Sequence, residues 1–222
     1  MSRTLALLFT LTALFPSHGL AQTAEPPKWD FSATTGLFSG RPAIAVTEHY
    51  GDRWYSSARA GISVGRYWTP NLKTEVEVMT SGEGMRYASR TAILADGTQW
   101  WYGAHEYFRT SQGSARVVWQ LLDNRWVHPY LLAGVALDAD RQHAFIPEQY
   151  RYLSDGRTPA IRELLVPQQT EGPATVYRVG AMVGAGAKLY FSPTVFANTA
   201  LLVTHAKPAK TVSIILGLGL DF

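Results

Sequence analysis

The sequence predicts an all-β protein, an eight-stranded antiparallel β-barrel that crosses a membrane, and three observations support this prediction. First, the residues from Thr211 to Phe222 alternate large apolar side chains with small or polar ones, and Ile215 is the exception. In a membrane barrel, lipid contacts the apolar face of such a strand and the polar face lines the lumen. Second, short and long connections alternate along the chain. Third, the chain begins with a segment typical of exported proteins.

The first 21 residues have the parts of a secretory signal peptide. Arg3 supplies a positive charge, residues 5–15 form a short apolar core, and Gly19-Leu-Ala21 is a small-residue cleavage site. We therefore expect residues 1–21 to be removed and residues 22–222 to form one barrel domain. The sequence contains no cysteine, which excludes a lipoprotein anchor and a disulfide framework.

Composition argues against several other classes of protein. No apolar run after the signal peptide approaches the ~20 residues of a membrane helix. The formal net charge of +3 is too small to indicate nucleic-acid binding. The mean hydropathy of -0.06 fits a barrel, because only every second residue of its strands is apolar. The six histidines lack zinc-site spacing, so we predict neither a metal site nor a cofactor.

Eight segments have the period-two alternation of a strand, and tight turns such as Trp68-Thr-Pro-Asn71 separate some of them. The first two strands are expected at residues 29–38 and 57–68. The third begins at residue 72, and the fourth ends at residue 121. The last four are expected at residues 129–140, 176–190, 195–205 and 211–222.

The connections between these strands are sorted by length. Short links follow the second, fourth and sixth strands, whereas long links follow the first, third and fifth. Outer-membrane barrels have this arrangement, with short periplasmic turns and long extracellular loops. The link at 206–210 is an exception, a short outer loop. We expect loops 39–55, 81–112 and 141–174 to be exposed outside the cell.

Aromatic residues gather at both predicted ends of the barrel, as in the interfacial girdles of membrane proteins. The periplasmic set consists of Trp29, Trp68, Trp119, Tyr130, Tyr190 and Phe222. The outer set consists of Phe38, Trp54, Tyr55, Phe108 and Tyr177.

The long link after the third strand contains a hairpin signal, Ala95-Asp-Gly-Thr98. A turn centred on Asp96 and Gly97 would pair Leu72 with Leu121, so that each arm far exceeds the ~9–11 residues that cross a bilayer. We predict a hairpin that protrudes above the membrane as a small sheet. A flexible extracellular loop is the alternative.

Three segments resemble the OmpA/OmpX-like small outer-membrane barrels: the strand-turn-strand pattern of residues 65–78, the strand from His128 to Leu137, and residues 180–194 followed by the Phe-terminated strand. The resemblance implies an eight-stranded barrel in the outer membrane of a Gram-negative bacterium, without a peptidoglycan-binding domain. It also implies insertion by the outer-membrane assembly machinery, which reads a terminal strand ending in Phe222. The protruding hairpin is similar to that of OmpX-type proteins, for which surface adhesion is the usual suggestion.

Charged residues occur on the predicted inward face. The lumen of an eight-stranded barrel is just wide enough to be filled by side chains, and buried charges need partners. We therefore predict a salt-bridge network that plugs the barrel, and a narrow OmpW-like channel for small solutes is the alternative. The inward set is Arg59, Lys73, Glu75, Glu77, Arg116, Arg178 and Lys188.

One histidine raises the alternative of a lipid A-modifying enzyme. His205 lies at the outer end of a strand on its lipid-facing side, where barrels with that activity place a catalytic histidine. The His-x-Ser-Asn run of PagL-type deacylases is absent here. Catalysis would need a serine or carboxylate near His205 or His105, and Ser213 and Glu106 are the candidates. We predict no catalytic residues.

Three further groups lie toward the outer end of the chain's predicted strands. Lys207 and Lys210 lie in the short outer loop, where they would contact lipopolysaccharide phosphates or simply keep the loop soluble. Asp138 and Asp140 share a face, but two carboxylates fall short of the 6–8 oxygens of a calcium site. A third group on the protruding arm is predicted to bind a surface ligand, or else to pack across the hairpin or at the upper girdle. It consists of Trp100, Trp101 and Tyr102.

Together these observations predict a monomeric outer-membrane barrel with a structural or surface-interaction role. The expected partners are outer-membrane lipid and lipopolysaccharide, the assembly machinery and an extracellular surface ligand.

Overall fold

A computed structural model describes residues 28–41, 54–94, 97, 99–122, 124, 126–153, 161–207 and 209–222. The predicted signal peptide and most of loop 39–55 lie outside these residues. No helix in the described part of the chain is long and apolar enough to cross a membrane.

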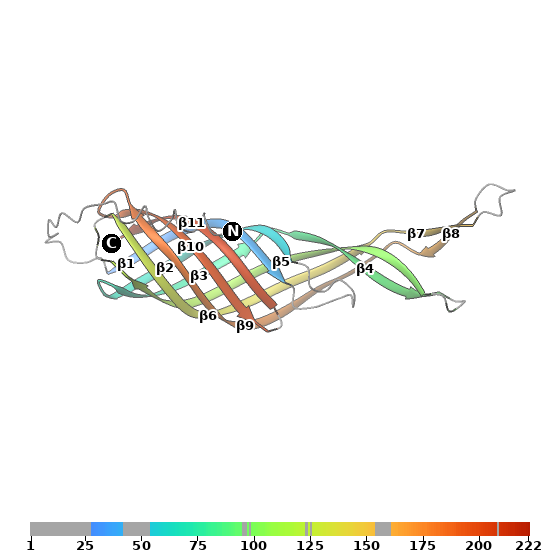
Figure 1. Cartoon of the computed structure of the whole chain (residues 1–222), viewed down its shortest axis with the longest axis horizontal. Coiled ribbons are helices and arrows are strands. Elements are labelled where there is room, and N and C mark those ends of the chain that lie inside the picture. Colours follow the sequence, from blue (N-terminus) through green and yellow to red (C-terminus); the bar gives the residue numbers. More distant parts are fainter. Residues whose placement is uncertain are drawn as a thin grey trace, which may run out of the picture.

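Eight antiparallel strands form a closed ring, which confirms the predicted fold class (Figure 1). Neighbouring strands pair in the order β3, β2, β1, β11, β10, β9, β6 and β5, and β5 pairs back onto β3. The ring strands are β1 (Trp29–Arg41), β2 (Tyr55–Thr69), β3 (Leu72–Ser81), β5 (Gln99–Gln120), β6 (Val127–Ile146), β9 (Gln169–Tyr190), β10 (Val195–Ala206) and β11 (Ala209–Asp221).

The first and last strands pair with each other, so the described ends of the chain lie side by side. Asp30 pairs with Asp221 and Phe31 with Leu220. The amide of Trp29 donates to the carbonyl of Phe222 at 2.9 Å. Because every backbone group of a bilayer-spanning wall needs a hydrogen-bond partner, this closure lets the strands contact lipid.

Side chains alternate between lipid and lumen along each ring strand, as predicted. The outward residues are large and apolar, for example Leu37, Ile62, Val135, Val179 and Leu218, each more than half exposed. The inward residues include many charged, polar and small ones, together with a buried apolar cluster that contains Met79, Leu132 and Ile215. An apolar exterior around an interior that contains many charged and polar side chains is suited to a bilayer.

The aromatic residues divide in a way that corrects the predicted girdles. Trp29, Trp68, Trp119 and Phe222 are exposed at the periplasmic end, and Trp54 and Tyr177 are exposed at the outer end. Phe38, Tyr55, Phe108 and Tyr130 are instead buried inside the barrel. The girdle prediction used depth along the strand alone, whereas the side of the wall depends on whether a residue is odd or even in its strand.

The predicted protruding hairpin is confirmed, with a corrected register. Strand β4 (Gly84–Ile93) pairs with the outer part of β5 beyond the barrel. Leu72 pairs with Trp119 and not with Leu121. Ile93 pairs with Gln99, whereas the predicted turn would have paired it with Trp100. An additional residue is accommodated between β3 and β4, as in a β-bulge, and this moves the register further.

The loop predicted at 141–174 is largely strand. Strand β6 continues to Ile146 and β9 begins at Gln169, both far beyond the predicted ends. Between them, β7 (Gln149–Leu153) and β8 (Ile161–Val166) form a second hairpin. Figure 1 shows both hairpins extending from the same end of the barrel. We call residues 84–93, 99–108, 141–146 and 169–175 the outer platform.

Candidate functional site

The predicted inward residues are placed in the lumen, where they are almost completely removed from solvent. Lys188 is 2% exposed, Glu77 1% and Arg59 5%. Lys73, Glu75 and Arg116 are buried to a similar degree. Arg178 lies in the outer part of the lumen, and its side chain is 7% exposed. Because buried charges are costly without partners, their pairing determines what the lumen can do.

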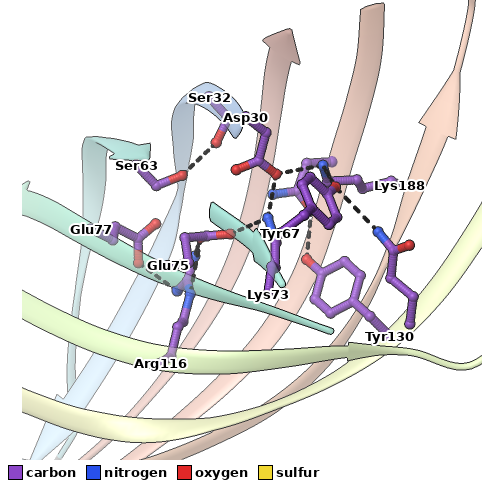
Figure 2. Close-up of polar contacts among 12 residues, drawn as sticks. Asp30, Ser32, Ser63, Tyr67, Lys73, Glu75, Glu77, Arg116, Tyr130 and Lys188 are labelled. Carbon is purple, nitrogen blue, oxygen red and sulfur yellow. Dashed lines mark hydrogen bonds and ion pairs between the residues drawn. The ribbon is translucent and has the colours of Figure 1, made fainter. Parts of the chain in front are cut away.

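The inner end of the lumen is built around two lysines. Lys188 Nζ lies 2.6 Å from Asp30 Oδ2 and donates to the Tyr67 hydroxyl at 2.8 Å (Figure 2). It also lies 3.1 Å from Asp221 Oδ1. Lys73 pairs with the same oxygen of Asp30. These contacts connect β9 with β1 and β2, which are not its neighbours in the ring. The network therefore crosses the lumen instead of following its wall.

Arg116 organises the middle of the lumen. Its guanidinium donates to Glu77 Oε2 at 2.6 Å and to Glu75 Oε1 at 3.0 Å. Glu75 also pairs with Lys73, which joins the middle layer to the inner one. Figure 2 shows this chain of contacts running from Arg116 to Lys188. A guanidinium that donates to two carboxylates is among the stronger arrangements in proteins.

The outer part of the lumen contains a third layer. Arg59 donates to Ser213 Oγ at 2.6 Å and to Gln112 Oε1 at 2.9 Å. Gln112 in turn donates to Asp138 Oδ1 at 2.7 Å. Arg178 pairs with Asp140, which also accepts from the Thr110 hydroxyl at 2.7 Å. Asp138 and Asp140, considered as a cation site in the sequence, therefore act as partners of protein donors.

Three aromatic rings pack across the outer end of the lumen, and we call them the aromatic cap. The ring centroids of Tyr55 and Phe108 are 4.8 Å apart, and those of Phe38 and Tyr55 are 5.5 Å apart. Arg59 lies over Phe38 from one side and Arg86 over Phe108 from the other. The lumenal polar layers are thus covered by apolar surface on the side of the platform.

Sequence analysis missed the acidic partners of the lumenal cations. Asp30 and Asp221 were on the inward face by period-two counting but were not included in the network. They sit near the ends of the first and last strands, and only the pairing of these strands brings them to one place. Gly65 is a local sign in the sequence that could have pointed to Asp30. It pairs with Asp30, and a side chain at this position would collide with that carboxylate.

The interior of the outer platform has its own ion pairs. Arg86 Nε donates to Glu106 Oε2 at 2.7 Å, and Arg90 Nη1 donates to Glu171 Oε2 at 2.5 Å. Burial lowers the pKa of Arg90, but the hydrogen bond and negative charge of Glu171, and then Glu106, outweigh it and raise that pKa. Ala104, Ile146 and Val166 form a small apolar core beside these pairs. The platform is therefore an ordered sheet with an interior.

The opposite face of the platform is apolar and exposed. Met85 is 54% exposed, Tyr87 59% and Ile93 80%. The three predicted binding residues are divided between the faces, because consecutive strand residues point opposite ways. Trp101 is 44% exposed beside Tyr87 and Ile93, whereas Tyr102 packs against the apolar core. Trp100 shares the inner side, and its indole Nε1 is buried.

The residues considered for catalysis are on different sides of the wall. His205 is exposed on the lipid-facing side, whereas Ser213 is buried in the lumen and accepts a hydrogen bond from Arg59. Glu106 lies inside the platform, whereas His105 points to its other face, where it contacts Tyr87 and Phe145. Within the described residues, no group of three or more acidic or histidine side chains is arranged to hold a metal ion.

Basic residues lie at the outer rim of the barrel exterior. Lys207 and Lys210 are both exposed at the turn between β10 and β11. Lys210 pairs with Arg41 on one side and with His205 on the other, so three basic residues lie in one row across the wall.

No family model and no curated protein matches this sequence. Solved structures do. Neisserial surface protein A is 12% identical with a TM-score of 0.52, and the match covers 87% of this chain and 97% of that one. Its fold is that of the small outer-membrane barrels.

Two other similar structures are those of an attachment protein and of a protease. The attachment invasion locus protein Ail of Yersinia pestis is 14% identical, with a TM-score of 0.47 and coverage of 88% of this chain and 99% of that one. The outer membrane protease OmpT of Escherichia coli is 11% identical, with a TM-score of 0.44 and coverage of 93% and 100%. A fold by itself assigns no activity to a chain. An eight-stranded transmembrane barrel with long connections at one end is the architecture of outer-membrane proteins, and we place the protein in that membrane.

Proposed function

We propose that this protein is a cell-surface recognition protein of the outer membrane, in which a plugged barrel anchors a rigid binding platform. One observation carries the proposal. Strands β5, β6 and β9 continue past the barrel as an ordered sheet with its own core, and Met85, Tyr87, Ile93 and Trp101 are exposed on one face of it. Exposed apolar side chains grouped on one surface are typical of binding sites.

The lumenal network supports an anchoring role for the barrel over a conducting one. Its three polar layers cross the lumen, and the aromatic cap covers their outer end. We propose that this set, from Lys188 to Arg178, stiffens and plugs the barrel. A narrow OmpW-like channel would need these pairs to separate, and a lipid A-modifying enzyme would need a serine or carboxylate beside His205.

Export, assembly and lipid contacts complete the proposal. Residues 1–21 would be removed on export, and the strand that ends at the exposed Phe222 would be read by the assembly machinery. The product would be a monomer with no bound cofactor and no metal. Lys207 and Lys210, both exposed at the outer rim, would contact lipopolysaccharide phosphates.

The test compares Gram-negative cells that display the wild-type chain with cells that display the double variant Tyr87→Ser and Trp101→Ser. Binding is measured to immobilised matrix proteins, to glycans and to cultured cells. We expect the wild-type protein to raise adhesion to at least one surface and the variant to abolish the gain. The matched control, Thr74→Ser and Thr80→Ser on the barrel exterior, should adhere like wild type. Equal adhesion of wild-type and empty-vector cells to every surface would contradict the proposal.

A further inference from the structure

Two arginines lie directly opposite each other on the outside of the barrel. Arg109 on β5 pairs in register with Arg141 on β6, and both side chains are exposed. Side chains opposite each other in neighbouring strands have Cβ atoms ~4.5–5.5 Å apart, and like charges at this separation destabilise the sheet. An arrangement that costs stability in the protein alone calls for a partner that offsets it.

Nothing in the described part of the protein neutralises this pair. Neither guanidinium makes a hydrogen bond or an ion pair with the described residues. The carboxylate of Glu83 faces another basic residue, with its Oε1 3.8 Å from His143 Nδ1. Asp138 and Asp140 lie on β6 as well, but they point into the lumen toward Gln112 and Arg178.

The position of the two arginines corresponds to one edge of the bilayer. On β5, residues 109–119 run from Arg109 to Trp119, and Trp119 is 57% exposed at the periplasmic end. This is the length of the ~9–11 residues with which a tilted strand crosses the hydrocarbon region. Between the two ends, the outward residues of β5 and β6 are uncharged. The arginines therefore lie at the headgroups of the outer leaflet.

The opposite side of the barrel has the same spacing. On β11 and β1, residues 210–220 and 31–41 connect Leu220 and Phe31 to the basic residues Lys210 and Arg41. Positive charge thus occurs at one height on two sides of the barrel, which supports the assignment of that height to an anionic layer.

The surface below the arginines is suited to acyl chains. Arg141 pairs with Thr175 of β9, and the next outward residues toward the bilayer are Tyr177 and Val179, which are 71% and 73% exposed. Leu137 is 53% exposed on the adjacent strand. A phosphate held by two guanidiniums above and hydrocarbon packed below describes a lipid with a phosphorylated headgroup.

We propose that Arg109 and Arg141 form a binding site for a phosphate of lipid A, the phosphorylated glycolipid of the outer leaflet. The two guanidiniums present several N–H donors to one phosphate, and the bound anion removes the repulsion between them. The site depends on how the barrel lies in the membrane and is independent of what the platform binds.

The test measures lipid A binding to protein refolded in zwitterionic detergent, for the wild type and for Arg109→Gln combined with Arg141→Gln. The double variant should bind about 25-fold more weakly, because one basic residue at an anionic membrane surface contributes roughly fivefold in affinity. Arg66→Gln is the matched control, since Arg66 is exposed at the other rim beside Trp29 and Trp68. It should bind lipid A like wild type.

Two further arms separate the sources of binding. Dephosphorylated lipid A should bind wild type about as weakly as lipid A binds the double variant, and millimolar inorganic phosphate should not displace lipid A, because phosphate alone lacks the acyl contacts. Urea unfolding adds a signature of opposite sign. Without lipid A the double variant should be as stable as wild type or more stable, and with lipid A it should be less stable.

Unchanged affinity of the double variant, or equal affinity of wild type for dephosphorylated lipid A, would overturn the site. If the double variant does not refold, as judged by gel mobility without heating, the comparison of the two lipids on wild type still decides.

Discussion

The barrel and the outer platform bury ion pairs in different ways. The barrel wall is closed by strand pairing around the whole ring, and its ion pairs lie inside a wall that is already continuous. The platform has two edge strands, β4 and the outer part of β9, and these are not paired with each other. The ion pair of Arg90 with Glu171 connects them at 2.5 Å.

Solvent exposure distinguishes the lumenal pairs from the Arg90–Glu171 pair that connects the platform edges. Lys188 and Asp221 are each 2% exposed, whereas the Glu171 side chain is 46% exposed. Water and salt weaken an ion pair of the second kind far more than one of the first. In the barrel, ion pairs stiffen a wall that strand pairing has already closed. In the platform, the Arg90–Glu171 pair connects two edge strands that no backbone hydrogen bonds join. Four substitutions, in order of expected effect, test this difference.

Lys188→Met should have the largest effect. It leaves Asp30 and Asp221 buried near each other with one cation fewer, and removing one member of a buried pair costs ~3–5 kcal/mol. Urea unfolding of the refolded barrel measures the loss. Arg66→Met, on the exterior, removes only the contacts of Arg66 with Trp29 and Trp68 and should cost ~1 kcal/mol. A Lys188 variant as stable as that control would show that the network does not stiffen the barrel.

Phe108→Ala should be next. It removes the ring that stacks on Tyr55 in the aromatic cap and should cost about 3 kcal/mol, as for other buried Phe→Ala changes. It also exposes the outer polar layer to water. We therefore expect a rise in single-channel conductance in planar bilayers relative to wild type. Unchanged stability would mean that the cap is not packed as described.

Glu106→Gln should loosen the platform and spare the barrel. It removes the carboxylate that Arg86 and Arg90 share inside the platform. Gln keeps an acceptor oxygen and loses only the charge, and a hydrogen bond to a charged group contributes ~1.5–3 kcal/mol, so local opening should increase roughly 10- to 100-fold. Limited proteolysis of intact protein in detergent detects this as faster cleavage between residues 84 and 108. If the global unfolding midpoint falls as much as in the Lys188 variant, the platform is not a separate unit of stability.

Glu171→Gln should have the smallest effect. It breaks only the partly exposed pair with Arg90, and we expect a few-fold increase in proteolysis of the platform at low salt. In 1 M salt the wild-type protein should approach the variant, because screening weakens the same pair. A difference between the two proteins that is equally large at both salt concentrations would contradict an electrostatic role.

The fold could be predicted because each ring strand carries its own signal. The alternation in residues 211–222 gave the lipid-facing side, and the sorting of connections gave the two ends. Strand ends were less accurate on β6 and β9, whose outer parts pair above the membrane and therefore lose the apolar alternation that marks a lipid-facing strand. The turn register also failed, because the added residue near Gly82 and Glu83 leaves no local sign.

The sequence was sufficient to predict which charged residues point into the lumen, but not which of them pair with each other. Period-two counting identified Lys73, Glu75 and Arg116 as inward, because direction is a local property of a strand. Their partners depend on which strands meet, and this is a property of the whole ring. Lys188 and Asp30 are far apart in sequence and meet because β1 and β9 both contribute inward side chains at one height. Trp101 and Tyr102 point to different faces because successive residues of a strand alternate between the two faces.

Strands β5, β6 and β9 run without interruption from the barrel wall into the platform. A partner that pulls on the platform would therefore pull along these strands. Force in this direction loads the hydrogen bonds of the wall in shear, many at once, and does not peel them apart one at a time. The same three strands that give the platform its position would thus give it mechanical strength.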